Sequence, residues 1–228
     1  MVAGKISSFV AKKKLIRFTE NLSYPHLLQP RYRDLLPVFR LYGNWGPAYF
    51  RNTNPITLEL GCGKGEYTVG LARSYPEQNF IGIDVKGARL WRGCKTVSEE
   101  GLQNVVFLRT RADHLESVFA PGEISAIWLT FPDPQSGKER KRLTSPVFLA
   151  RYRKVLSPSG IVHLKTDDHD LFAYTLQQLE DMKAELLLVT EDVYQACLQD
   201  PVTQIQTYYE HLWQDEGRKI LYLKFRFR

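Results

Sequence analysis

The 228-residue sequence predicts an α/β fold in which helices cover both faces of a mostly parallel sheet. From residue 55 onward, apolar runs of strand length alternate with segments of helix length, which is the pattern of βαβ units. Hydrophobic residues make up 43% of the chain and charged residues 25%, as in ordinary globular proteins. A chain of this size buries about 70% of its unfolded surface, so one domain with additions accounts for the length.

The expected elements follow the chain in order. The apolar runs that predict strands lie at residues 56–60, 80–85, 105–108, 124–131, 161–164, 186–189 and 220–227. The segments that predict helices lie at residues 66–74, 88–100, 146–156 and 171–183. The last apolar run alternates with a period of two, which indicates a half-exposed antiparallel strand late in the sheet.

Residues 1–40 differ from the rest in composition. They contain the run Lys12–Lys14 and three spaced prolines, Pro25, Pro30 and Pro37. We expect a basic N-terminal arm over residues 1–40 and one folded domain over residues 41–228.

Charge is distributed unevenly around the net value of +6. Residues 1–40 carry eight basic against two acidic side chains, and residues 138–154 carry seven against one. Residues 155–217 carry two against twelve, and the last eleven residues add five basic side chains. Clustered Lys and Arg release counterions from a phosphate backbone, so this pattern favours contact with nucleic acid. A solvated surface is the alternative for any single cluster.

The sequence shows no feature of export or of a metal centre. It has no uncharged apolar run of about 18 residues, and its N-terminus has no apolar stretch followed by a small-residue cleavage site. Cys62, Cys94 and Cys197 are odd in number and form no C-x-x-C pair, and the five histidines have no ligand spacing. We therefore expect a protein of the reducing cytoplasm without a structural metal.

The first predicted strand ends in three alternating glycines, Gly61, Gly63 and Gly65, and a predicted helix follows. Glycine permits a tight turn and close approach of the main chain to a ligand at the helix N-terminus. A dinucleotide-binding loop would place a glycine where this chain has Glu66, and an acid there repels a pyrophosphate. The loop therefore favours a nucleoside ligand without phosphates.

Two acids lie beside this loop. Glu59 precedes it by two residues, and Asp84 ends the next predicted strand, where a carboxylate accepts hydrogen bonds from ribose hydroxyls. Glu59 would then hold a cationic ammonium group. S-adenosylmethionine has a ribose, an ammonium and a sulfonium and lacks phosphate, so it fits this pattern. The alternative is a glycine turn in an unrelated α/β protein.

Five motifs occur in a fixed order along the chain, at Leu58–Glu66, Gly82–Val85, Phe131–Pro134, Leu164–Asp167 and Thr207–Glu210. Together they resemble the bacterial tRNA (guanine-N7)-methyltransferases, the TrmB family, from about residue 40 to the C-terminus. The resemblance implies a class I methyltransferase fold, Rossmann-like, with a seven-stranded sheet whose last strand is antiparallel. It also implies S-adenosylmethionine as methyl donor and a guanine in the variable loop of tRNA as acceptor.

The resemblance assigns roles to individual residues. The implied cofactor-binding residues are Glu59, Gly61, Gly63, Gly65, Asp84, Arg111, Ala112 and Asp133, of which Asp133 is also the implied catalytic residue. The implied substrate-binding residues are Gly137, Lys138, Asp167, Thr207, Tyr208, Tyr209 and Glu210.

Two segments depart from the family pattern. The segment between Pro134 and Leu143 is shorter than in most members, so the family's loop lysine matches Lys138 or, literally, Gly137. Arg111 occupies the position of an acid that usually flanks adenine, and Asp113 is the alternative acid.

Guanine N7 has a lone pair and no proton, so methyl transfer to it needs no general base. Catalysis then depends on proximity and electrostatics, and Asp133 is expected to stabilise the shifting charge. The alternative for Asp133 is a turn acid. Asp168 is expected to cap a helix, which leaves Asp167 to bind substrate, and the alternative for Glu210 is a surface acid.

Contacts to RNA phosphates are expected from Lys12–Lys14 and Lys138–Arg142, and Trp45 is the tryptophan expected to touch RNA. Two other functions stay open: a class I methyltransferase that acts on another RNA or a small molecule, and a catalytically silent tRNA-binding protein. Glu66 disfavours a nucleotide-dependent oxidoreductase. The sequence leaves open both a monomer and a homodimer.

Overall fold

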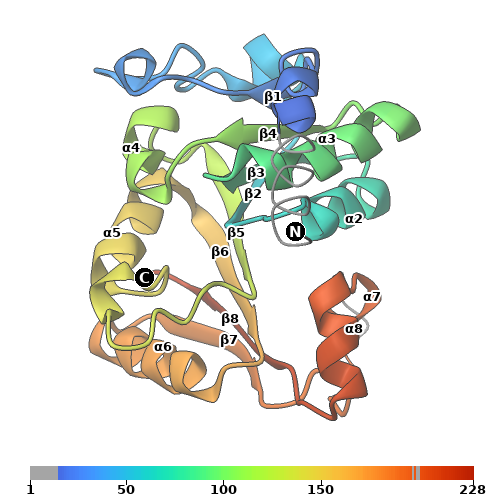
Figure 1. Ribbon diagram of the computed structural model, residues 1–228. Helices are drawn as coiled ribbons and strands as arrows, with labels where there is room; N and C mark the ends of the chain where they lie inside the picture. The colour runs from blue at the N-terminus through green and yellow to red at the C-terminus, as the bar shows by residue number, and fades with distance from the viewer. Residues whose placement is uncertain (1–14, 197, 199–200) are drawn as a thin grey trace.

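The computed structural model describes residues 15–196, 198 and 201–228, so Lys12–Lys14 and Cys197 lie outside the described residues. An eight-stranded sheet runs through the middle with helices on both faces (Figure 1). The strand order is β1-β4-β3-β2-β5-β6-β8-β7. The strands are β1 (Leu27–Leu28), β2 (Ile56–Leu60), β3 (Asn79–Asp84), β4 (Val105–Arg109), β5 (Ile124–Thr130), β6 (Leu156–Thr166), β7 (Glu185–Thr190) and β8 (Leu221–Arg226).

The helices form two groups. One group, α2 and α3 with α7 and α8, covers one face, and α4, α5 and α6 cover the other (Figure 1). Their bounds are α2 (Glu66–Ser74), α3 (Gly87–Glu100), α4 (Leu115–Val118), α5 (Pro146–Val155), α6 (His169–Asp181), α7 (Pro201–Gln204) and α8 (Tyr208–Asp215). Short 3-10 or π turns are η1 (Tyr32–Leu35), η2 (Trp45–Phe50), η3 (Ala112–His114) and η4 (Glu139–Lys141), and residues 15–20 are also helical.

The predicted fold class is confirmed. The strands from β1 to β6 pair in parallel, and β8 pairs antiparallel with both β6 and β7, as the period-two pattern near the C-terminus indicates. The predicted strand at 56–60 and the predicted helix at 66–74 have the observed bounds. The expected helix over 146–156 ends one residue earlier, and β6 begins at Leu156, which pairs with Ile124.

The count of strands differs from the expected seven because of β1. This strand has two residues, Leu27 and Leu28, which pair with Phe107 and Leu108 of β4. Two residues are too few to show a period in the sequence. The described part of residues 1–40 contributes side chains to the core as well, since Leu35 and Phe39 are buried there.

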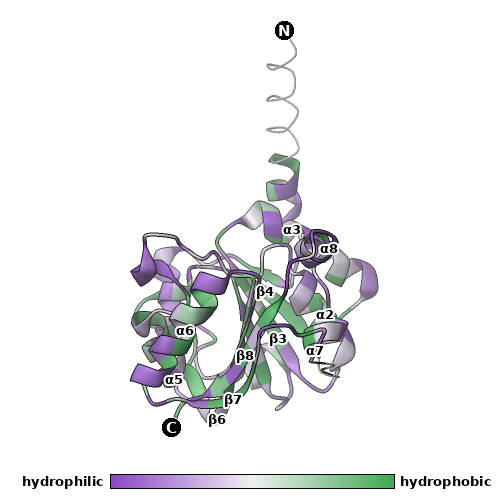
Figure 2. Ribbon diagram, turned by 90° about the horizontal axis from the view of Figure 1, so that it is seen from below, coloured by the Kyte–Doolittle hydropathy of each residue, from purple (hydrophilic) through white to green (hydrophobic). Residues whose placement is uncertain are grey.

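Two hydrophobic cores lie on the two faces of the sheet. Figure 2 shows hydrophobic residues along the central strands and hydrophilic residues on the surrounding helices and loops. Such burial is the main favourable contribution to folding, at about 25 cal/mol for each Å² of apolar surface. Among the described residues, no helix is both long enough and apolar enough to cross a membrane.

The expectation that Trp45 touches RNA is wrong. Its side chain is fully buried, and its indole Nε1 donates a hydrogen bond to the carbonyl oxygen of Val118 at 3.1 Å. The ring packs against Phe39 and Phe119, with centroids 5.8 and 5.4 Å away. Neighbouring glycines made the position look exposed in the sequence, whereas the residue is part of the core.

Candidate active site

The predicted functional residues gather at one edge of the sheet. Parallel strands place their carboxyl ends on the same edge, and ligands bind there in open α/β sheets. The glycine loop follows β2, Asp84 ends β3, and Asp133 follows β5. In the sheet order, β2 lies between β3 and β5, so the glycine loop is central.

The glycine loop depends on glycine at each of its three predicted positions. Gly61, Gly63 and Gly65 have φ angles of +76°, +57° and +73°, in the left-handed region that other residues rarely adopt. A Cβ atom at Gly65 would lie 2.4 Å from the ring of Phe107. The N–H of Gly61 donates to the carbonyl oxygen of Ile83 at 2.8 Å. These contacts hold the loop against β3.

Asp84 joins this loop to the end of β3. Its Oδ2 accepts from the N–H of Gly63 at 3.0 Å, and its Oδ1 accepts from the N–H of Lys86 at 2.7 Å. A carboxylate can accept about four hydrogen bonds, so Asp84 keeps capacity for ligand hydroxyls. The structure therefore brings together Asp84 and the glycine loop, as the sequence predicts.

A cavity of about 110 Å³ lies between the glycine loop, the end of β5 and the start of α8. Its lining residues come from four separate parts of the chain: Glu59, Gly61, Cys62, Gly63, Lys64, Glu66, Tyr67, Arg89, Thr130, Phe131, Thr207 and Tyr209. This convergence makes the cavity the candidate centre of the site.

Glu59 places a buried carboxyl group in this cavity. Burial raises the pKa of Glu59 to about 8; the hydrogen bond from the Thr68 hydroxyl opposes this rise, and the charges of Asp84 and Glu66 add to it. In the part of the chain that the structure describes, no Lys or Arg forms an ion pair with Glu59. A buried acid with a raised pKa is a feature of functional sites, and a cationic ligand would suit it.

Thr130 adds a polar atom that the sequence analysis missed. Its hydroxyl is buried, lines the same cavity, and has no hydrogen-bond partner within the described residues. An unsatisfied buried polar atom costs about 1–3 kcal/mol, which a ligand in the cavity would relieve. The sequence did contain one indication of this role: Thr130 is the last residue of a buried strand and directly precedes the Phe131–Pro134 motif.

The turn after β5 holds Asp133 at the surface. Phe131 has a φ angle of +48°, which is uncommon for a bulky residue, and its N–H donates to the carbonyl oxygen of Lys165 at 2.7 Å. Asp133 is exposed, and its Oδ1 accepts from the N–H of Gln135 at 3.0 Å. Unusual backbone conformations of this kind concentrate at functional sites.

The two acids after β6 have different partners. Asp168 caps α6, because its Oδ1 accepts from the N–H of Leu171 at 2.6 Å. Asp167 does not cap the helix and instead pairs with Arg218, whose Nη1 lies 3.0 Å from its Oδ2. Asp168 is therefore the cap, as expected, and Asp167 stays a predicted substrate ligand.

The N-terminus of α8 completes the cavity wall. The Thr207 hydroxyl caps the helix, and the N–H of Tyr208 donates to Oε2 of Glu66 at 2.9 Å. Tyr208 and Tyr209 are each about half exposed, at 54% and 53%. Tyr209 stacks on Trp213 with 5.8 Å between ring centroids. The structure therefore places two of the four predicted residues, Thr207 and Tyr209, in the lining of the cavity, with the half-exposed Tyr208 between them in the chain.

The fourth residue of this motif, Glu210, faces the interior. Its side chain is fully buried, and its Oε1 lies 2.6 Å from Nζ of Lys165, which is buried as well. The Tyr194 hydroxyl donates to the same oxygen at 2.6 Å, and Nζ of Lys165 donates to the carbonyl oxygens of Val202 and Ile205. Glu210 is thus neither a surface acid nor a lining residue of the cavity. Glu210 is buried because it lies on the side of the first turn of α8 that faces Lys165.

The basic loop after Asp133 divides into exposed and buried members. Gly137, Lys138, Arg140 and Lys141 are exposed. Arg142 is 7% exposed, and its Nε donates to the carbonyl oxygen of Pro134 at 2.9 Å. The expected phosphate contact of Arg142 is therefore wrong, because this side chain supports the turn that carries Asp133.

A second cavity of about 200 Å³ lies beyond Asp84, at the ends of β3 and β4. It is lined by Pro30, Tyr32, Leu35, Val85, Arg109, Thr110, Arg111 and His114. Arg111 lines it and pairs with Asp113 at 2.9 Å, while Ala112 begins η3 beside it. Sequence reasoning missed the contribution of residues 30–35, because they precede the predicted domain.

A family model described as "Putative methyltransferase" matches residues 53–223. A tRNA (guanine-N(7)-)-methyltransferase from Christiangramia forsetii is 49% identical over 222 residues, which are 96% of this chain and 99% of the relative. One from Bacteroides thetaiotaomicron is 48% identical over 219 residues, which are 95% of this chain and 86% of the relative.

Solved structures show the same fold at low identity. The 16S rRNA methyltransferase KamB aligns with a TM-score of 0.61 at 14% identity and covers 76% of this chain and 88% of its own. An S-adenosylmethionine-dependent methyltransferase from Aquifex aeolicus aligns with a TM-score of 0.53 at 15% identity and covers 76% and 82%. These similarities establish a class I methyltransferase fold.

The buried ion pair predicts the effect of removing its cation. We expect Lys165→Met to lower the free energy of unfolding by about 3–5 kcal/mol, because Glu210 would stay buried without its partner. Urea unfolding followed by circular dichroism measures this change. The double variant Lys165→Met/Glu210→Gln should regain most of the loss. Lys138→Met, an exposed control, should stay within about 0.5 kcal/mol; an equally small effect of Lys165→Met would contradict the assignment.

Proposed function

The chain belongs to the tRNA (guanine-N(7)-)-methyltransferase family, and from this premise we propose that it methylates N7 of a guanine in the variable loop of tRNA with S-adenosylmethionine as cofactor. The observation that carries the cofactor assignment is Glu59: a buried carboxyl without a cationic partner among the described residues, in a cavity beside a glycine loop. Family membership carries the choice of acceptor.

The residues present fit this cofactor. Glu59 suits the ammonium group, the glycine loop lets the main chain approach closely, and Asp84 suits the ribose hydroxyls. The unpartnered Thr130 hydroxyl offers a polar contact in the same cavity. The second cavity is lined by Val85, which follows Asp84 in the chain. It therefore lies next to the expected position of the ribose, and we place the adenine ring there.

Glu66 argues against a cofactor that contains a pyrophosphate. Its carboxylate stands at the N-terminus of α2 and already accepts the N–H of Tyr208. When bound, S-adenosylmethionine supplies a methyl group activated by a sulfonium. The chain supplies carboxylates, Glu59 and Asp84, for the positive and hydroxyl groups of the cofactor.

On the acceptor side, Asp133 is the group that we assign to catalysis. Guanine N7 carries no proton, so the side chain need not act as a general base. Its exposed carboxylate can accept hydrogen bonds from the N1–H and amino edge of guanine and can stabilise positive charge as it develops on the base. The turn from Phe131 to Gln135 fixes its position, which reduces the cost of orienting the base.

Tyr208 and Tyr209 suit an unstacked base. Sequence-specific RNA recognition uses bases that leave their stack and pack on aromatic side chains. Tyr209 is supported from behind by Trp213, which also contacts Phe131 with 4.7 Å between centroids. The exposed cations Lys138, Arg140 and Lys141 are placed to contact phosphates near the turn that carries Asp133.

One assay tests the proposed function. The protein is incubated with labelled S-adenosylmethionine and unmodified tRNA, and the RNA is then cleaved chemically at 7-methylguanosine. Cleavage in the variable loop supports the proposal. Methyl incorporation without that cleavage would instead indicate a methyltransferase of different specificity, and tight tRNA binding without incorporation would indicate a silent binder.

Asp133 gives a prediction for catalysis. We expect Asp133→Asn to lower kcat by about 100-fold or more, because it removes the charge that acts in the transition state. Asparagine can still accept the N–H of Gln135, so the turn should persist and cofactor binding should change little. Single-turnover methylation and calorimetry measure the two quantities. Glu139→Gln on the same loop is the matched control, and near-normal turnover of Asp133→Asn would remove this residue from the mechanism.

Glu59 gives a prediction for pH dependence. With its pKa raised to about 8, this group is largely protonated at pH 7 in the free protein. A cationic ammonium favours the ionised form, so cofactor binding should release up to one proton and should tighten as pH rises from about 6 to 8. Calorimetry in two buffers of different ionisation enthalpy measures the released proton. Glu59→Gln should bind weakly and release none; equal release from both proteins would contradict the assignment.

The same group provides an internal control without cofactor. Its folded-state pKa of about 8 lies above the ordinary value of 4.5. The stability it contributes is therefore fully present below about pH 4.5 and is lost progressively as pH rises from there to about 8, by up to about 5 kcal/mol in total. Glu59→Gln should lack this loss and should be the more stable protein at pH 8.

A further inference from the structure

A group of basic side chains lies on α3 and around it, and only one of its members, Arg17, belongs to a basic cluster that the sequence singled out. We define the α3 basic surface by five residues: Arg17, Lys64, Arg89, Arg92 and Lys95. Residues 86–95 carry four basic and no acidic side chains, whereas residues 41–137 as a whole carry a net charge of −1. The net charge of residues 41–137 therefore does not reveal this surface.

The members of the α3 basic surface are connected to one another. Arg17 and Lys95 lie over the same ring of Trp91, 4.7 and 5.4 Å from its centroid. Lys64 and Arg89 line the cavity that contains Glu59. Lys64 also lines a larger groove together with Arg92. The surface therefore runs from the candidate active site outward along α3.

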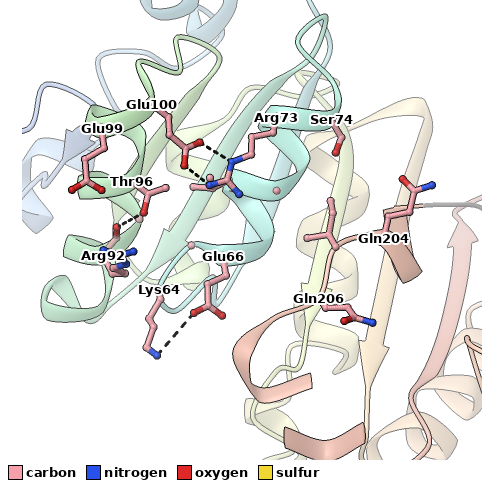
Figure 3. Close-up of a pocket in the computed structure, with 15 residues that line it drawn as sticks. Lys64, Glu66, Arg73, Ser74, Arg92, Thr96, Glu99, Glu100, Gln204 and Gln206 are labelled. Atoms are coloured by element: carbon pink, nitrogen blue, oxygen red, sulfur yellow. Dashed lines mark hydrogen bonds and ion pairs between the residues drawn. The ribbon is translucent and has the colours of Figure 1, made fainter. Parts of the chain in front are cut away.

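The larger groove, of about 500 Å³, lies between α2, α3 and residues 204–206. Figure 3 shows Lys64 and Arg92 beside it, with the amides of Gln204 and Gln206 on the opposite side. Each of its three acids has a partner: Glu100 pairs with Arg73, Glu99 lies 3.8 Å from Lys95, and Glu66 accepts the N–H of Tyr208 and lies 4.0 Å from Lys64. The groove and the smaller cavity share Lys64 and Glu66, so the two spaces adjoin.

This arrangement concentrates positive charge where local structure disfavours it. The first turn of a helix carries a partial positive charge that favours acids, yet the first turn of α3 contains Arg89 and no acid, and Lys86 precedes it. A polyanion would relieve this cost, and contact with Trp91 keeps the charged ends of Arg17 and Lys95 near the surface.

We propose that the α3 basic surface binds phosphates of the tRNA segment that flanks the methylated guanine, a proposal that rests on the proposed function. In the sheet, β3 and β5 lie on either side of β2. The α3 basic surface, which follows β3, and the loop with Lys138, Arg140 and Lys141, which follows β5, therefore flank the glycine loop from two sides. The RNA backbone crosses the carboxyl edge of the sheet between them, with the target base beside Asp133 and Tyr209.

The test removes two charges from this surface at residues that do not line the smaller cavity, which contains Glu59. We expect Arg92→Ala/Lys95→Ala to reduce the slope of log K against log salt for unmodified tRNA by about two. The KM for tRNA should rise while kcat at saturation and the affinity for S-adenosylmethionine stay unchanged. A matched control is Arg51→Asn/Lys183→Asn, which removes two exposed charges at the opposite edge of the sheet and suits the positive φ of both positions.

The outcomes separate the surface from the function. An unchanged salt slope for Arg92→Ala/Lys95→Ala, or an equal fall for the control, overturns the proposed surface. If the slope falls as expected while the wild-type protein yields no 7-methylguanosine, the surface stands and the proposed function fails. Equal melting temperatures of the variants show that neither result comes from unfolding.

Discussion

The ion pair between Lys165 and Glu210 links the two sides of the active site. The side chain of Lys165 fixes the first turn of α8, while its carbonyl oxygen accepts the N–H of Phe131. One residue of β6 therefore positions both the turn that carries Asp133 and the aromatic helix opposite to it. Because buried charges without partners are costly, this pair restricts α8 to one position over the sheet edge.

The two buried glutamates of this site show what a charged group requires in the interior. Glu210 has Lys165, the Tyr194 hydroxyl and the capping contacts of Thr207, and it acts as structure. Glu59 has the hydroxyl of Thr68 and a raised pKa, and within the described residues no Lys or Arg forms an ion pair with it. Both are buried, and the main difference between them is the lysine 2.6 Å from Glu210.

Charge on the surface follows a related division. Arg142 belongs to the most basic stretch of the sequence, yet it is buried and supports the Asp133 turn through Pro134. Apart from Arg17, the α3 basic surface comes from a stretch with a net charge of −1, and its cations are all at least partly exposed. Folding thus separates basic residues that support the site from those that a polyanion can reach. The positive potential at the surface comes from the second group.

The sequence by itself determined the α/β class, the order of the major elements, the glycine loop and the acids at two strand ends. It could do so because strand and helix periods are local, and because parallel strands bring their carboxyl ends to one edge. The tertiary structure decided the rest. Contacts between residues far apart in the chain turned Glu210 toward a buried lysine and buried Trp45 in the core. Such contacts also joined residues 27–28 to the sheet and residues 30–35 to a cavity. Burial and pairing of this kind have no local signal, because the same side chain suits either environment until its partner is in place.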